Sequence, residues 1–597
     1  MPTNDPQTPT MNMHEALNLA IGHHQAGRLA EAEAIYLQIL RLEPKQPDAL
    51  HLLGMIELQT GRGQRAVDLI KQAIDIDPSA AVYYNNLGLA LQDRGDLDAA
   101  VAAYRRAIEL LPDYATAYSN LGNAFGARCQ FDEAIEAYGA ALRVKPDFAE
   151  AKYNLGNAFK DTGRIDEAIA VYRDALKIKT DYITAQSNLI FALYFSPKFN
   201  AQEIHQELLN WTHRHAEPLK KFILPHTNHR DPERRLKIGY ISGDFREHVV
   251  GWNLSPLLRQ HNREQLEIFC YSSSKSFDNL TRSIKESADV WRNIAGIDDQ
   301  RAAQIIRDDQ IDILIDLASH TANNRLLIFA RKPAPVQVTY LGYAGSTGLD
   351  TIDYRFSDPY LDPPESDLSI YSEQTMRLPE VYWCYQPGGS APQVTPLPAL
   401  SAGFITFGCM NNFYKVSSGA WDLWMQILGA VPNSRLIIYA HVGSHRDVVR
   451  ERFGKNGIAP ERLEFIGKQP WPEYMNTYNR IDIALDPFPY NGGITTCDSL
   501  YMGVPVVSLS GQTAVGRAGK SILTNLGLPE LVAKTPQEYV DIAIKLAGDL
   551  SRLAELRNTL RQRMENSPLM DAKRFARNVE AAYREMWRKW CDERGEF

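Results

Sequence analysis

The chain has 597 residues, 44% of them hydrophobic and 23% charged, and a formal net charge of −8. This length predicts three or four domains of about 150 residues each. The composition is that of a globular protein and excludes a largely disordered chain. The acidic balance gives no overall field that would attract nucleic acid or an anionic membrane, so we expect neither as a partner.

The first residues and the cysteines bear on the compartment. Residues 1–12 are polar, carry no basic and apolar leader, and are expected to form a disordered N-terminus. The sequence has no run of about 18 apolar residues that could span a bilayer. Its six cysteines are scattered without a Cys-x-x-Cys pair, which favours a reducing cytoplasm over a disulfide framework or a zinc site. We therefore expect a cytoplasmic protein.

A period of 34 residues runs through residues 13–199. Small residues and prolines recur at this spacing, and a large side chain usually stands four positions after each repeated alanine. Such a pattern is typical of stacked pairs of antiparallel helices, in which small residues allow close contact and proline ends the second helix. It resembles the tetratricopeptide repeat and predicts a superhelix. The repeated positions include Pro44, Pro78, Pro112 and Pro146, and Gly54, Gly88, Gly122 and Gly156.

Four asparagines share one register of the repeats. Because a superhelix stacks equivalent positions, their side chains are expected to form a ladder on one face. An amide offers both a donor and an acceptor, which suits the backbone of an extended acceptor peptide. The alternative is a consensus surface residue that bonds only to water. The four residues are Asn86, Asn120, Asn154 and Asn188.

The periodicity ends near residue 199, and residues 200–233 are interpreted as a connecting helix and linker. From residue 234 short apolar runs such as LKIGYIS and IDILIDL alternate with amphipathic segments, which predicts parallel strands with crossover helices. The pattern restarts after a turn-rich segment, so we expect two Rossmann-like lobes, at 234–390 and 400–597. Ligands of such sheets bind beyond the carboxyl ends of the strands.

The stretch LDPFPYNGGITTCDS carries a candidate phosphate site. Gly492 and Gly493 follow a predicted buried strand and allow a ligand to approach the backbone, while Thr495 and Thr496 open a helix. The free N–H groups of a helix N-terminus favour a diphosphate. Asp498, one turn further on, is placed to accept from ribose hydroxyls. The alternative is an ordinary glycine turn with a threonine cap.

Three further residues follow predicted strands. Lys415, in the motif NNFYK, could neutralise the charge of a departing nucleotide, and His248 and His320 have a ring suited to general-base work near neutrality. Each could instead be a solvated surface residue. Asp-x-Asp triplets occur only in the repeats, so we expect no metal site: lysine and the helix dipole would neutralise phosphate. A near match to the P-loop at 514–521 lacks its first glycine and does not indicate an NTPase.

Together with the repeats, the motifs GYISGDFREH, RKPAPVQVTYLGYAGSTG, GCMNNFYK and LDPFPYNGGITTCDSLYMGVPVV resemble those of the protein O-GlcNAc transferases and their bacterial and SPINDLY-type relatives. The resemblance implies a GT-B fold, and an inverting, metal-independent glycosyl transfer from a nucleotide sugar to Ser or Thr without a cofactor. It also implies roles for matched residues: Lys415 at the pyrophosphate, Asn412 and Thr495 at the donor, Asp498 at the ribose, and His248 as the histidine proposed as a base.

The chain departs from the family pattern at two donor positions, where Tyr474 replaces a usual histidine and Ile494 a usual threonine. We expect UDP-GlcNAc as the donor and protein acceptors held by the repeats. A different donor, such as GDP-fucose, and a catalytically degenerate repeat scaffold remain the alternatives. The sequence also leaves open whether the repeats form a homo-oligomer.

Overall fold

The computed structural model describes residues 12–593, so the expected disordered N-terminus lies almost entirely outside the described residues. The chain forms two compact units, Met1–Ala158 and Phe159–Phe597. The sequence had placed the end of the repeats near residue 199, but the last repeat helices belong to the same unit as the two lobes. In the described part of the chain no helix is both long and apolar enough to cross a membrane.

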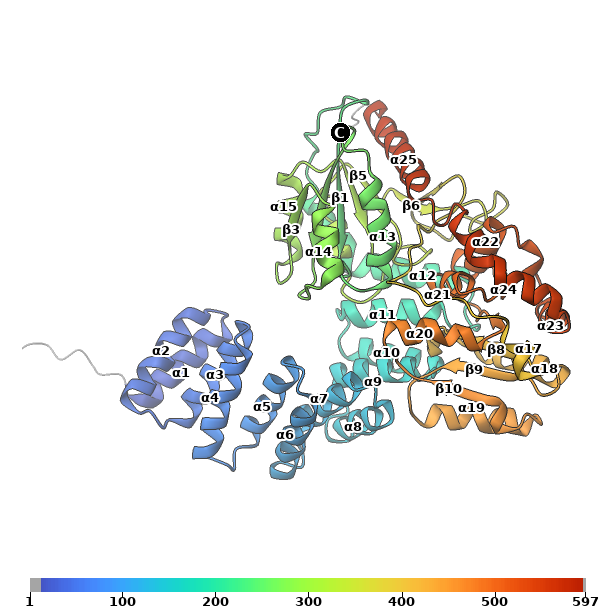
Figure 1. The fold of residues 1–597 in the computed structure, drawn as a ribbon. Coiled ribbons are helices and arrows are strands. Elements are labelled where there is room, and N and C mark those ends of the chain that lie inside the picture. The colour runs from blue at the N-terminus through green and yellow to red at the C-terminus, as the bar shows by residue number, and fades with distance from the viewer. Residues whose placement is uncertain (1–11, 594–597) are drawn as a thin grey trace, which may run out of the picture. The chain divides into compact units, whose positions relative to one another are not determined.

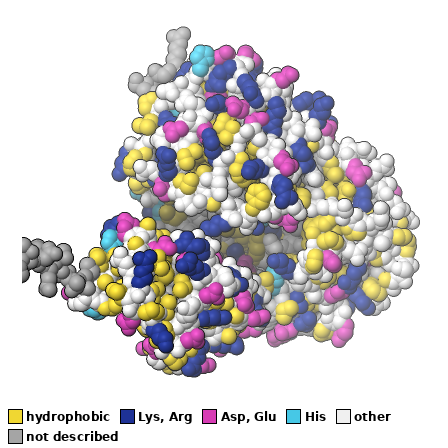
Figure 2. Space-filling view, turned by 60° about the vertical axis from the view of Figure 1, so that its left-hand side comes forward, with side chains coloured by type: hydrophobic (Ala, Val, Ile, Leu, Met, Phe, Trp, Pro, Cys, Tyr) yellow, Lys and Arg dark blue, Asp and Glu magenta, His cyan; other side chains and the backbone are white. Residues whose placement is uncertain are grey.

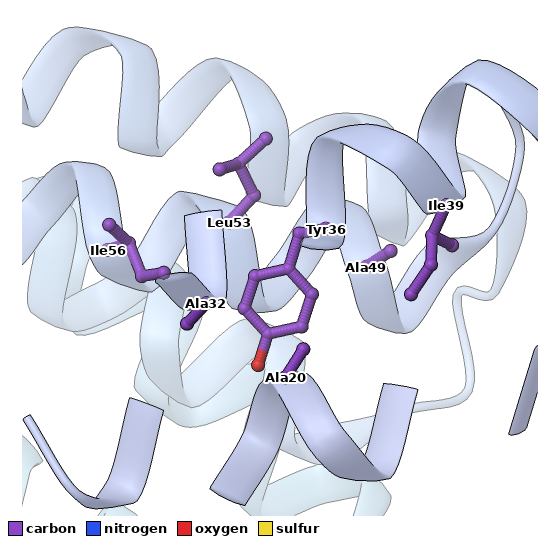
Figure 3. Close-up of a cluster of buried hydrophobic side chains, with 7 residues drawn as sticks. All are labelled: Ala20, Ala32, Tyr36, Ile39, Ala49, Leu53 and Ile56. Carbon is purple, nitrogen blue, oxygen red and sulfur yellow. The ribbon is translucent and has the colours of Figure 1, made fainter. Parts of the chain in front are cut away.

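The first unit consists of helix pairs whose packing explains the 34-residue period. A Cβ added to Gly88 or Gly122 would lie 2.5 Å from the ring of Tyr104 or Tyr138. The repeated glycine therefore leaves the space that the repeated tyrosine fills. In the first helix pairs the buried ring of Tyr36 packs among alanine, leucine and isoleucine side chains (Figure 3). The helices are α1 (Met13–Gln25), α2 (Leu29–Leu42), α3 (Pro47–Gln59), α4 (Gly63–Ile76), α5 (Ala81–Asp93), α6 (Leu97–Leu110), α7 (Ala115–Ala127), α8 (Phe131–Val144) and α9 (Ala149–Asp161), which ends in the second unit.

The second unit begins with the last repeat helices and continues into the first lobe (Figure 1). The lobe is built on a parallel sheet of strand order β3-β2-β1-β4-β5-β6-β7. The chain adds strands on one side of β1 up to β3 and on the other side from β4 onwards, so the strand order reverses between β1 and β4. The last repeat helices are α10 (Ile165–Ile178) and α11 (Ile183–Leu193), and α12 (Ala201–Trp211) follows them. The helices and strands of the lobe are β1 (Leu236–Ser242), α13 (Val249–Gln260), β2 (Leu266–Ser272), α14 (Asn279–Glu286), β3 (Val290–Asn293), α15 (Asp299–Asp308), β4 (Ile313–Asp316), α16 (Leu326–Phe329), β5 (Val336–Thr339), β6 (Tyr354–Ser357) and β7 (Gln374–Arg377).

The second lobe repeats this design with a parallel sheet of order β10-β9-β8-β11-β12-β13, which reverses between β8 and β11. Both predicted Rossmann-like lobes are thus confirmed. The elements are α17 (Pro398–Ala402), β8 (Thr406–Cys409), α18 (Ser418–Ala430), β9 (Arg435–Tyr439), α19 (Ser444–Lys455), β10 (Leu463–Ile466), α20 (Trp471–Thr477), β11 (Ile483–Leu485), α21 (Ile494–Tyr501), β12 (Val506–Leu509), α22 (Ala518–Asn525), β13 (Val532–Ala533), α23 (Pro536–Ala547), α24 (Leu550–Glu565) and α25 (Ala572–Asp592).

The last helix differs from the sequence-based division of the chain. We expected residues 400–597 to form the second lobe, but α25 packs on α13 and β5 of the first lobe. The hydroxyls of Tyr583 and Tyr240 lie 3.0 Å apart, and Glu580 pairs with the buried His261 at 3.0 Å. The amphipathic α25 buries its aromatic face there, because the first lobe offers apolar and polar partners along one side.

Buried polar contacts tie the two lobes together. Arg517 of the second lobe pairs with Asp362 of the first at 3.1 Å, and Asp362 also pairs with Arg355 at 2.8 Å. Four residues after Arg517, Ser521 donates to Asp358 at 2.5 Å. The segment that resembles a P-loop in sequence therefore joins the lobes.

Candidate active site

The glycine loop lies at the point where the strand order of the second lobe reverses. β11 ends at Leu485, and Asp486 accepts a hydrogen bond from the backbone N–H of Gly492 at 2.8 Å. A Cβ on Gly492 would lie 2.6 Å from the hydroxyl oxygens of both Thr495 and Thr496. A side chain at this position would therefore fill the entrance to the first turn of α21.

The threonines of α21 face a cavity of about 10 Å³ beyond the ends of β8 and β11. The hydroxyl of Thr495 donates to Asn411 Oδ1 at 2.7 Å. The hydroxyl of Thr496 is buried and has no hydrogen-bond partner in the structure. Buried polar groups are nearly always paired, so an unpaired hydroxyl at a helix N-terminus is what a ligand oxygen would satisfy.

Lys415 lies beside this helix, in the turn that follows β8. Its ammonium donates to the carbonyl oxygen of Asn491 at 3.1 Å and lies 4.3 Å from the ring centroid of Tyr490. Burial lowers the pKa of Lys415 to about 8, and the nearby carboxylate of Asp486 opposes that shift. A cation is thus held at the loop that leads into α21.

Asp498 is buried among tyrosines. Its Oδ1 accepts from the hydroxyl of Tyr385 at 2.7 Å, and the hydroxyl of Tyr474 acts electrostatically on the same carboxylate. Burial raises the pKa of Asp498 to about 7, while the two hydroxyls act in the opposite direction. The hydroxyls of Tyr474 and Tyr478 lie 2.9 Å apart. Tyr474, which stands where the family resemblance leads us to expect histidine, therefore lies close to the carboxylate expected to bind ribose.

The segment between the lobes borders the same site. A Cβ on Gly493 would lie 3.3 Å from Nε1 of Trp383. A Cβ on Gly388 would lie 2.8 Å from Nε1 of Trp471 on α20 and 3.3 Å from Nε1 of Trp252 on α13. The first turns of α13 and α20, one from each lobe, thus meet across this segment.

The two candidate histidines have different surroundings. His248 caps α13, four residues before Trp252, and is half-buried, with its ring nitrogen 3.5 Å from the carboxylate of Asp244. Burial lowers the pKa of His248 below its usual value, and the charge of Asp244 opposes that shift. His320 is fully buried, and its ring nitrogens are hydrogen-bonded to Ser187 at 3.1 Å and to the Thr347 carbonyl at 2.8 Å. A base must reach the substrate, so the structure gives His320 a packing position and we do not place it in the reaction.

Other predicted positions are also placed. Asn412 is exposed, and its amide donates to the hydroxyl of Tyr414 at 2.9 Å, whereas its neighbour Asn411 accepts from the hydroxyl of Thr495. Asn411, Asp486, Trp383 and Tyr385 are the site residues that sequence reasoning did not assign. Asp486 directly follows β11 and Asn411 is the second residue after β8, so both lie where parallel strands deliver ligand-binding residues. Trp383 and Tyr385 lie in a turn-rich segment with no local pattern that indicates a site.

The repeat asparagines are half-buried, and two of them, Asn86 and Asn120, are linked through Asn85. Asn120 donates to Asn85 at 2.9 Å, Asn85 donates to Asn86 at 3.0 Å, and Asn86 lies 2.7 Å from a ring nitrogen of His51. The row of amides is thus a hydrogen-bonded chain in the first unit. Each amide has more than one donor or acceptor site, so contact with a peptide is still possible. Asn154 and Asn188 occupy the same register on α9 and α11.

Two parallel sheets of this order, with the N-terminus of α21 at one reversal point, define an α/β protein of the GT-B type. The model of glycosyl transferase family 41 matches residues 207–386 and 397–579, and tetratricopeptide-repeat models match 17–81, 91–128 and 120–183. The chain belongs to glycosyl transferase family 41.

Individual relatives agree with this assignment. The probable UDP-N-acetylglucosamine–peptide N-acetylglucosaminyltransferase SPINDLY of Petunia hybrida is 42% identical over 61% of this chain and 40% of its own length. The corresponding SEC protein of Arabidopsis thaliana is 31% identical over 60% and 38%. The match thus spans less than half the length of these relatives. A solved lysine-to-methionine mutant of the O-GlcNAc transferase of Thermobaculum terrenum is 37% identical, with a TM-score of 0.81 over 86% of this chain and 98% of that one.

Proposed function

We propose that this protein transfers a sugar from a nucleoside diphosphate sugar, preferentially GlcNAc from UDP-GlcNAc, to Ser or Thr of proteins bound by its repeats, with inversion and without a metal. The single observation that carries the proposal is the convergence of Lys415, the N-terminus of α21 and Asp498 at one strand-order reversal. A lysine and a helix N-terminus suit a diphosphate, and a carboxylate one turn away suits the ribose.

In this proposal the protein acts mainly on the leaving group. Negative charge develops on the diphosphate as the sugar departs, and Lys415 and the N–H groups of α21 stabilise it without reorganisation. The hydroxyl of Thr496 donates to a phosphate oxygen and gains the partner it lacks. His248, on the facing element of the first lobe, is the proposed group to accept the proton of the acceptor hydroxyl.

The partners and the compartment belong to the same proposal. Protein acceptors are supported by the repeats, and a cytoplasmic location by six scattered cysteines. On the face drawn in Figure 2, Lys and Arg side chains are interspersed with Asp and Glu. Such a surface favours neither nucleic acid nor an anionic membrane as a partner.

The test is the variant Lys415→Met. Removing one preorganised positive donor costs on the order of 10²–10³ in rate, so transfer from UDP-GlcNAc to a mixture of acceptor proteins should fall by that factor. Lys455→Met, which removes an exposed lysine of the same lobe, should leave transfer unchanged. The assay is run with and without EDTA, and an equal rate in both is expected. Near-normal transfer by Lys415→Met with an unchanged melting temperature would contradict the proposal.

The same assay separates the alternative donors. If GDP-fucose supports transfer and UDP-GlcNAc does not, the chemistry stands and the donor assignment is wrong. The observation that favours this second candidate is Tyr474, which lies near Asp498 at a donor position where the family resemblance leads us to expect histidine. If the chain binds neither UDP nor GDP, it is the repeat scaffold that the sequence left as an alternative.

A further inference from the structure

An aromatic cluster connects the last repeat helix with the turn that carries Lys415. Phe195, two residues after α11, is buried, with its ring centroid 4.8 Å from that of Tyr414 and 5.0 Å from that of Tyr490. Tyr414 directly precedes Lys415, and Tyr490 provides the ring over which the ammonium lies. One side chain of the repeat segment therefore contacts both residues that flank the lysine in space.

Lys415 has two fixed contacts on consecutive residues of the donor loop. The ammonium donates to the carbonyl oxygen of Asn491 at 3.1 Å, and its distance to the Tyr490 ring centroid is 4.3 Å, within the range of a cation–π contact. A lysine ammonium has three donors, so it can keep the carbonyl contact and still bind a phosphate oxygen. The carboxylate of Asp486, whose charge acts on Lys415, already accepts hydrogen bonds from the N–H of Gly492 and the hydroxyl of Ser508.

From these contacts we infer that Tyr490 is a positioning residue for Lys415, and that Phe195 holds Tyr490 in place from the repeat side. The ring face attracts the cation, and the carbonyl of the next residue fixes its direction. Without the ring, the flexible stem of Lys415 would allow the ammonium to leave the phosphate seat for solvent. The inference rests on the proposed function, because it assigns Tyr490 to the binding of the nucleoside diphosphate.

The experiment measures UDP and GDP binding by calorimetry with the full chain. Tyr490→Leu keeps an apolar side chain but removes the ring, and Tyr490→Phe keeps the ring. A desolvated cation–π contact predicts that Tyr490→Leu weakens nucleotide binding by about 3- to 30-fold while Tyr490→Phe stays near wild type. Phe148→Leu, which removes the aromatic partner of Lys145 in the repeats, is the matched control and should leave nucleotide binding unchanged.

A double-mutant cycle separates positioning from damage to the fold. If Tyr490 acts through Lys415, then Tyr490→Leu has no further effect on UDP binding in a Lys415→Met background. Phe195→Leu should weaken UDP binding in the wild type but not in a Tyr490→Leu background. Equal weakening of UDP binding with and without Lys415, or no weakening in the wild type, would overturn the inference and leave the proposed function standing. If the wild type binds neither UDP nor GDP, both are overturned.

Discussion

Burial brings three ionisable side chains of the donor site close to neutrality. It raises the pKa of Asp486 and of Asp498 to about 7, and it lowers the pKa of Lys415 to about 8. Groups with shifted pKa values tend to gather at functional sites. Here they also predict how nucleotide binding depends on pH.

We expect the affinity for UDP to fall as the pH rises through about 8. The charged form of Lys415 is the one that attracts the diphosphate, and its lowered pKa means that the proton is lost near pH 8 rather than above 10. Calorimetric titration of UDP between pH 7 and 9.5 measures the decline. Lys415→Met should bind weakly with no such decline, and a wild-type affinity that is constant up to pH 9.5 would contradict the prediction.

Ile494 begins α21, at a position where the family resemblance leads us to expect threonine. A hydroxyl there could donate to a phosphate oxygen, and a hydrogen bond to a charged group is worth about 1.5–3 kcal/mol. We therefore expect Ile494→Thr to bind UDP or GDP roughly 10- to 100-fold more tightly than the wild type. Ile494→Val, which has a similar shape without the hydroxyl, is the matched control. Equal affinities of the threonine and valine variants would show that the hydroxyl has no phosphate partner.

Local sequence predicts those site residues that lie on one loop. Gly492, Thr495, Thr496 and Asp498 follow from a glycine turn that opens a helix, and the structure has that helix begin at Ile494. The tyrosine partners of Asp498 could not be predicted in this way. Tyr385 lies 113 residues before Asp498, and only the folded chain brings its hydroxyl to the carboxylate. The buried position of His320 could not be predicted from local sequence either, because its hydrogen-bond partner Ser187 lies on the repeat helix α11, 133 residues earlier in the chain.

At the scale of single elements, the short apolar runs of the sequence predicted most of the strands. LKIGYIS coincides with β1 and IDILIDL contains β4, and the runs LEIFCYS, VQVTYLGY, FITFGCM, SRLIIYA, LEFIG, IDIALDPF and PVVSLS each contain one strand. The strands that were not predicted are β3, β6, β7 and β13. β3 and β7 are half-exposed edge strands, and β13 has two residues. β6 contains Arg355, a buried charged residue that is compensated by an ion pair with Asp362. Because the local sequence does not show this ion pair, the segment does not look like a buried strand.

The asparagine row gives a prediction for the repeat helices. The double variant Asn120→Ala, Asn154→Ala should raise the KM for protein acceptors severalfold, because it removes amides that can bond to a peptide backbone. Hydrolysis of the donor in the absence of acceptor should stay unchanged, since Asn120 and Asn154 belong to the first unit and the donor loop belongs to the second. The two rates are compared in one preparation. A parallel loss of both would indicate damaged folding instead of lost acceptor contacts.

At the scale of the whole molecule, the buried carboxylate of Asp362 is one of the contacts that join the lobes. Burial alone would raise the pKa of Asp362, but Arg355 and Arg517 outweigh it and hold the pKa below the usual value. Asp362→Asn leaves two buried guanidinium groups without their counter-ion. Breaking a buried pair costs about 3–5 kcal/mol of the free energy of unfolding.

Chemical denaturation measures this loss. Asp447→Asn, which breaks an exposed pair with Arg450, should cost less than about 1 kcal/mol and serves as the control. Because the network joins the lobes, we also expect Asp362→Asn to reduce the cooperativity of unfolding. A loss similar to that of the control would mean that other contacts hold the lobes together.

The return of α25 to the first lobe has a consequence for synthesis on the ribosome. The strands of that lobe are complete at Arg377, but Tyr583 and Glu580, which cover Tyr240 and His261, are made about 200 residues later. At about 5–20 residues per second this delay is on the order of 10–40 s. During that interval the nascent first lobe exposes the surface that α25 will cover. We therefore expect chaperones to bind the nascent first lobe at this stage. The lobe that is translated first is therefore the one that is finished last.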